Sequence, residues 1–103
     1  MKPTQNQKKE MLEWCGADIY AGLFTFRNGE GSWSVASWEP SLNWLFRFAV
    51  PRLNNDYYID IMNYRDKWQA RVQSKSGLVG SKEVHKDPAL ALFWAIKKVQ
   101  EVR

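Results

Sequence analysis

A capped, strongly apolar segment at residues 87–102 constrains the fold more than any other part of the sequence. Asp87 can accept hydrogen bonds from the first free N–H groups of a helix, and Pro88 suits the first helical position because it has no N–H to lose. The spacing that follows predicts a helix with one broad apolar stripe. That stripe consists of Ala89, Leu92, Phe93, Ala95, Ile96, Val99 and Val102. It must pack on a sheet or on another helix.

The composition predicts one globular domain, residues 1–103. Of its residues 45% are hydrophobic and 15% aromatic, including six tryptophans, which is enough for a real core. The net charge of +4 is spread along the chain, whereas a dedicated nucleic-acid binder usually has a denser basic stripe. A single cysteine, Cys15, excludes an intrachain disulfide and favours a reducing compartment. No apolar run approaches the roughly 20 residues of a membrane span, so we expect a cytoplasmic protein without membrane contact.

Two helices are expected before the middle of the chain. The first is an N-terminal helix over residues 4–15, with Thr4 as its cap and Gly16 as its stop. The second covers residues 39–53, with Pro40 at its start and Pro51 limiting its end. Its predicted apolar stripe is Leu42, Leu45, Phe46, Ala49 and Leu53.

The aromatic segment at residues 17–38 leaves two alternatives open. Asn28-Gly29 and Gly31-Ser32 are typical of turns, with apolar residues on both sides. The segment is therefore either a loose hairpin or an irregular loop whose aromatic side chains enter the core.

Residues 57–74 predict a hairpin around the two-residue loop Arg65-Asp66. The resulting register places Ile59 opposite Val72 on a mostly apolar face, and Asp60 opposite Arg71 on the other face. An opposite-charge pair in a register chosen on other grounds supports that register. We expect Ile59 and Val72 to be buried beneath the last helix.

The predicted core order is helix–strand–strand–(strand)–helix within residues 39–102. Residues 81–86 form the optional third strand, with Val84 pointing inward. Both core helices should pack on the face of Ile59 and Val72. The N-terminal helix could then cover the opposite face, which carries Tyr58, Met62 and Tyr64. The expected fold class is α+β, with an antiparallel sheet of two to four strands between helices in α/β/α layers.

Two segments resemble a family of small phage and prophage proteins, the phage "ABA sandwich" domain. They are Ser41–Leu53, with the pattern Leu-Asn-x-Leu-Phe-x-x-Ala-Val-Pro, and Lys86–Val99, with the pattern Asp-Pro-Ala-Leu-Ala-Leu. The resemblance covers residues 38–102 and implies an α/β/α sandwich from a phage or prophage. It implies no activity and assigns no functional residue.

No residue pattern predicts catalysis, a cofactor or a metal site. His85 is the only histidine, and we expect it at an exposed loop or strand end. Cys15 lies at the end of a helix, where a reactive thiolate is not favoured. We therefore expect a chain that is not an enzyme.

Two binding surfaces remain as alternatives. The first is a protein-binding surface on the second sides of the two core helices, which would contact a host or phage protein or another copy of the chain. Its residues are Trp44, Phe48, Leu90, Trp94, Lys97 and Lys98, unless residues 17–38 cover them. We expect most of Trp94 to be buried beneath that segment, with its edge, Lys97 and Lys98 left at the surface.

The second alternative is nucleic-acid binding. Residues 80–86 resemble the end of a double-stranded-RNA-binding domain, where lysines at the start of the last helix contact phosphates. Here Glu83 replaces a lysine, and Asp87-Pro88 would start the helix too late. The candidate contacts are Lys82, Lys86, Arg71 and Lys67. Of the two alternatives, protein contact is the first expectation.

Overall fold

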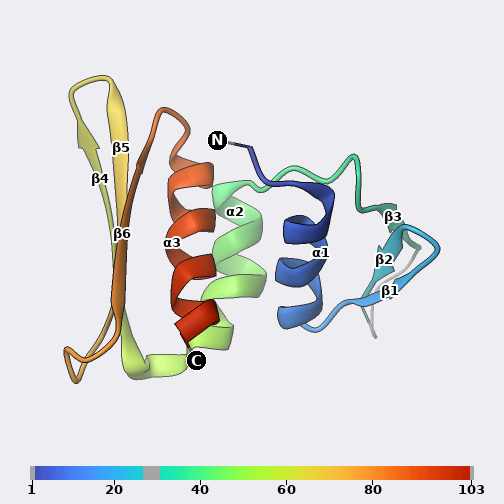
Figure 1. Ribbon diagram of the computed structural model, residues 1–103, viewed down its shortest axis with the longest axis horizontal. Helices are drawn as coiled ribbons and strands as arrows, with labels where there is room; N and C mark the ends of the chain where they lie inside the picture. Colours follow the sequence, from blue (N-terminus) through green and yellow to red (C-terminus); the bar gives the residue numbers. More distant parts are fainter. Residues whose placement is uncertain (1, 27–30, 103) are drawn as a thin grey trace. The chain divides into compact units, whose positions relative to one another are not determined.

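The computed structural model describes residues 2–26 and 31–102, and the chain divides into two compact units, Lys2–Glu39 and Pro40–Arg103. Each unit combines helical segments with its own three-stranded antiparallel sheet (Figure 1). The α+β class expected from the sequence is confirmed. Within the described residues, no helix is both long and apolar enough to cross a bilayer.

The first unit begins with α1, Gln5–Trp14, which is capped as the sequence predicts. The Thr4 side chain accepts a hydrogen bond from the Gln7 backbone N–H, and the Gln7 side chain accepts one from the Thr4 N–H. This reciprocal capping box satisfies two donors that the helix leaves free. Gly16 follows the helix with a φ of 100°, a conformation that favours glycine, and so ends it.

The aromatic segment of the first unit is a small sheet rather than a loop. It contains β1 (Asp18–Tyr20), β2 (Leu23–Thr25) and β3 (Trp33–Ser34) in the order β1-β2-β3. Phe24 pairs with Trp33 and is buried, so the hairpin alternative is correct for these strands. The predicted Asn28-Gly29 turn lies outside the described residues. A second hairpin, between β1 and β2, turns through Ala21 and Gly22 at positive φ, and the sequence did not reveal it.

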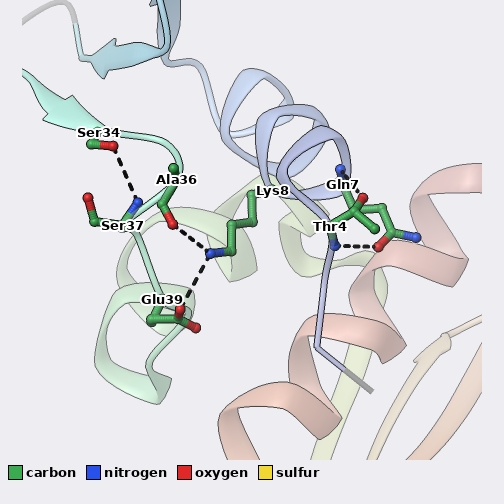
Figure 2. Close-up of polar contacts among 7 residues, drawn as sticks. All are labelled: Thr4, Gln7, Lys8, Ser34, Ala36, Ser37 and Glu39. Carbon is green, nitrogen blue, oxygen red and sulfur yellow. Dashed lines mark hydrogen bonds and ion pairs between the residues drawn. The ribbon is translucent and has the colours of Figure 1, made fainter.

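A buried lysine connects α1 to the end of the first unit. Lys8 is only 7% exposed, and Figure 2 shows its Nζ between the carbonyl oxygen of Ala36 (3.1 Å) and Oε1 of Glu39 (3.4 Å). The aliphatic stem is buried while the charged group reaches two oxygens, as is usual for a long cationic side chain. Lys8 thereby holds residues 36–39 against α1.

The helical segment that opens the second unit is less regular than expected. It begins at α2 (Leu42–Trp44), continues as a π-helix, η1 (Leu45–Ala49), and ends as a 3-10 helix, η2 (Val50–Asp56). The cap is Ser41, whose hydroxyl accepts the Trp44 N–H at 3.1 Å, so the predicted start at Pro40 is wrong. Pro51 has no N–H and its ring crowds the preceding turn, which accounts for the change of helix type there.

The irregular helix changes which side chains are buried. Three residues of the predicted stripe, Leu45, Ala49 and Leu53, are fully buried. Phe46 is 45% exposed, because the wider π turn moves it away from that stripe.

The second sheet consists of β4 (Tyr57–Tyr64), β5 (Lys67–Ser74) and β6 (Gly80–His85), in that order. The predicted register is confirmed over the whole hairpin, including Ile59 opposite Val72 and Asp60 opposite Arg71. The prediction for Val84 is wrong. Val84 pairs with Gln69 and is 53% exposed, because strand alternation puts it on the face opposite Ser81 and Glu83.

The last helix, α3 (Pro88–Val102), starts as predicted, with Asp87 Oδ1 accepting the Ala89 N–H at 2.8 Å. It packs over β5 and β6, and α2 and η1 pack against α3 rather than covering the sheet themselves (Figure 1). Val72 on β5 is fully buried, as predicted, whereas Ile59 on β4 is only half-buried. The expected burial of Ile59 beneath the helix is therefore wrong, because the helix lies over the other two strands.

The other face of the second sheet carries several large side chains. Its large side chains are exposed, with Tyr58 at 61%, Met62 at 52% and Tyr64 at 63%. Within the second unit, no described helix packs on this face. The second unit therefore has the layer order sheet, α3, α2–η1, and both helical layers lie on the same side of the sheet.

Candidate functional site: the open face of the second sheet

The solvent-facing side of the second sheet is the most distinctive surface of the second unit. We call it the open face. It is formed by Tyr58, Asp60, Met62 and Tyr64 of β4, Lys67, Gln69, Arg71 and Gln73 of β5, and Lys82 and Val84 of β6. Side chains alternate along a strand, so the register alone brings these residues to one side. Four large apolar or aromatic side chains exposed on one face of a small sheet are typical of a binding surface.

The open face has an aromatic residue near each end of β4. Tyr58 and Tyr64 lie six positions apart, about 20 Å along an extended strand. A cation lies near each ring, with Lys75 Nζ 5.5 Å from the Tyr58 centroid and Arg65 Cζ 6.0 Å from the Tyr64 centroid. The face therefore pairs exposed rings with positive charge.

The charge of the open face is predominantly positive. Lys67, Arg71 and Lys82 are exposed cations, and Asp60 is the one carboxylate among the outward positions of the three strands. Asp60 is matched by Arg71, with 2.5 Å between Oδ2 and Nη2. The excess positive charge suits an anionic ligand.

The structure brings together three of the four residues predicted for nucleic-acid contact. Lys67, Arg71 and Lys82 share the open face, while Lys86 follows β6 as an exposed residue. Sequence reasoning placed Tyr58, Met62 and Tyr64 on this face and left open whether the N-terminal helix covers them. It missed Val84, whose direction follows only from the register of β6 on β5.

The residues predicted for a protein-binding surface divide between surface and interior. The rings of Trp44 and Phe48 lie 4.9 Å apart and are half-buried, and Arg47 lies 5.1 Å from the Phe48 centroid. On α3, Trp94 is half-buried and lies edge-on to Phe93, with 5.1 Å between ring centroids.

The remaining residues of that predicted surface are not all exposed. Leu90 is buried, and Lys97 is only 2% exposed with its Nζ 3.7 Å from Glu101, so the expected surface position of Lys97 is wrong. Lys98 is exposed and pairs with Glu83 at 2.8 Å. Because α3 contacts both the sheet and the α2–η1 segment, its second side also carries buried residues.

The residues that could suggest chemistry have structural roles. His85 Nδ1 accepts the Asp87 backbone N–H at 3.1 Å, and Asp87 in turn caps α3. Cys15 is buried at the C-cap of α1. In the described part of the chain, no group of three His, Cys, Asp or Glu side chains could hold a metal ion.

Comparisons with known proteins give no relative for this chain. No family model matches it, and no curated protein and no solved structure matches it significantly. The resemblance to the phage domain therefore stays a prediction.

Proposed function

We propose that this chain is a non-enzymatic module that binds single-stranded nucleic acid on the open face. The observation that supports this proposal most is the combination of two exposed tyrosines with three cations on one uncovered side of a sheet. Bases stack on aromatic rings irrespective of sequence, and cations beside them neutralise the phosphates.

The geometry favours a single strand over a duplex. In the double-stranded alternative, lysines at the start of the last helix contact phosphates across a groove. Here Lys82 lies within β6, among the outward residues of the sheet, and α3 begins only at Pro88. A single strand has unpaired bases that can lie flat on Tyr58 and Tyr64, whereas a duplex keeps its bases stacked inside.

Protein contact is the second candidate function. It is favoured by the group of Trp44, Phe48 and Arg47, because tryptophan and arginine are common anchors of protein interfaces. We rank it below nucleic-acid binding because Leu90 and Lys97 of the same predicted surface are buried.

The proposed setting is the cytoplasm of a bacterium that carries the phage or prophage. The phage origin rests on the resemblance of residues 41–53 and 86–99 to the phage domain family. The compartment rests on the single cysteine, which favours a reducing environment.

Fluorescence anisotropy with a labelled, unstructured homopolymeric oligonucleotide tests the proposal. Tyr64→Ala should weaken binding by about 5- to 150-fold, since stacking of one base contributes about 1–3 kcal/mol. Tyr20→Ala is the matched control, because Tyr20 is 85% exposed but lies on β1 of the first unit. It should leave the affinity unchanged.

Three results would contradict the proposal. They are no measurable binding by the wild type, equal losses for the two tyrosine variants, and tighter binding of a duplex than of a single strand. The last result would favour the double-stranded alternative.

A further inference from the structure

The outer edge of β4 is an unprotected strand edge. β4 is eight residues long and lies at one end of the β4-β5-β6 order. It pairs with β5 without interruption, so it has no bulge, and it contains no proline. Among the described residues, no strand pairs with its other side. A long, regular and largely apolar edge of this kind readily pairs with another chain.

Both faces of β4 are also poorly covered. On the helical side, Ile59 and Ile61 are half-buried, while their partners Val72 and Ala70 on β5 are fully buried. On the open face, Met62 is 52% exposed. A further strand beside β4 would remove apolar surface from water on both sides of the sheet.

The opposite edge of the sheet shows the protection that β4 lacks. β6 carries Lys82 and Glu83, and Glu83 pairs with Lys98 of α3 at 2.8 Å. Ser81 Oγ donates to the Ala95 carbonyl oxygen of the same helix. Charges on an edge strand and cover from a helix are the usual means by which proteins prevent edge pairing. The contrast makes β4 the edge that is available to a partner.

We propose that β4 pairs antiparallel with β4 of a second copy of this chain, forming a continuous six-stranded sheet. The pairing that best fits the side chains is centred on Ile61, which lies opposite Ile61 of the other copy. Tyr58 then faces Tyr64 of the other copy on the open face, and aromatic cross-strand pairs are favourable. Because paired positions differ by an even number, the open faces of both copies remain on the same side.

The charge of β4 is compatible with this register and with a second copy as the occupant. Asp60 is the only charged residue of β4, and it is neutralised within its own chain by Arg71. Centring the pair on Asp60 would place two carboxylates directly opposite each other, which is unfavourable. Centring it on Ile61 places Asp60 opposite Met62 of the other copy, so no like charges face each other. This self-complementarity does not depend on nucleic-acid binding.

Charge substitution at Met62 tests both the pairing and its register. In sedimentation experiments over a wide concentration range, we expect the wild type to form a dimer. Met62→Lys puts an opposite charge across from Asp60 at two symmetric positions and should tighten the dimer about 2- to 30-fold. Met62→Glu puts a like charge there and should weaken the dimer by a similar factor.

Val84 provides the matched control. It has almost the same exposure as Met62, 53% against 52%, and it lies on the same face opposite Gln69 but on the other edge strand. Val84→Lys and Val84→Glu should leave the dimer unchanged, and thermal melts should show that all four variants fold.

Three results would overturn the proposal. They are a wild type that stays monomeric at the highest concentration, equal dissociation constants for Met62→Lys and Met62→Glu, and Val84 variants that shift the dimer as strongly as the Met62 variants. Should Met62→Glu fail to fold, the predicted tightening by Met62→Lys still decides the question.

Discussion

At the residue scale, burial and charge make different contributions to the stability that Lys8 provides. Its stem is buried within the first unit, while its Nζ reaches Ala36 and the largely exposed carboxylate of Glu39. An ion pair with one exposed partner contributes little, about 0–1 kcal/mol. Burying three or four methylene groups contributes more, at about 0.8 kcal/mol each. We therefore expect packing of the stem to outweigh the ion pair.

Three substitutions separate these contributions. Lys8→Ala removes most of the stem and should lower the free energy of unfolding by about 2–3 kcal/mol. Lys8→Met keeps an unbranched apolar side chain of similar length and should cost clearly less. Glu39→Gln removes only the charge of the partner and should cost under about 1 kcal/mol. Urea unfolding measures all three, and a Lys8→Met variant as unstable as Lys8→Ala would show that the charge dominates.

At the scale of secondary-structure elements, only one face of the β4–β5 hairpin contributes buried side chains to the core. Val72 is fully buried beneath α3, Ile59 opposite it is half-buried, and the Asp60–Arg71 pair is exposed to solvent. The stability contributed by each of these residues should therefore follow its burial and not its size or charge.

This order can be measured with three variants at concentrations where the chain is monomeric. Val72→Ala should cost about 2 kcal/mol or more, because it leaves a cavity in a packed core. Ile59→Ala should cost less, although it removes more atoms, and Arg71→Ala should cost under about 1 kcal/mol. Denaturant titrations give the three values. If Ile59→Ala proved the most costly, Ile59 would have to be covered more fully than the structure shows.

Elements defined by local chemistry could be predicted from the sequence, and those shaped by distant contacts could not. The caps Thr4 and Asp87 and the hairpin register depend on residues a few positions apart. The π-helix before Pro51 depends on the backbone hydrogen bond that Pro51 cannot donate. The apolar spacing of residues 42–53 does not reveal this change of helix type. The outward direction of Val84 required the pairing of β6 with β5 to be known.

At the scale of the whole molecule, the candidate site exists because the helices of the second unit pack on only one face of its sheet. The sequence alone selected Lys67, Arg71 and Lys82 and placed the tyrosines of β4 on one face. It could not indicate that α2 and η1 pack behind α3 and that the other face stays exposed, because that choice depends on contacts far apart in the sequence. The same exposed face combines the aromatic rings and the cations that we propose bind nucleic acid.

The salt dependence of oligonucleotide binding tests this central claim most directly. If Lys67 and Lys82 each neutralise one phosphate of a single strand while Arg71 stays paired with Asp60, the logarithm of the association constant should fall with the logarithm of salt concentration with a slope of about −1.4. Lys82→Gln should reduce the magnitude of the slope by about 0.7, since one phosphate contact is lost. Lys9→Gln, an exposed lysine of α1 in the first unit, should leave it unchanged. A wild-type slope near zero, or equal changes in the two variants, would contradict nucleic-acid binding on the open face.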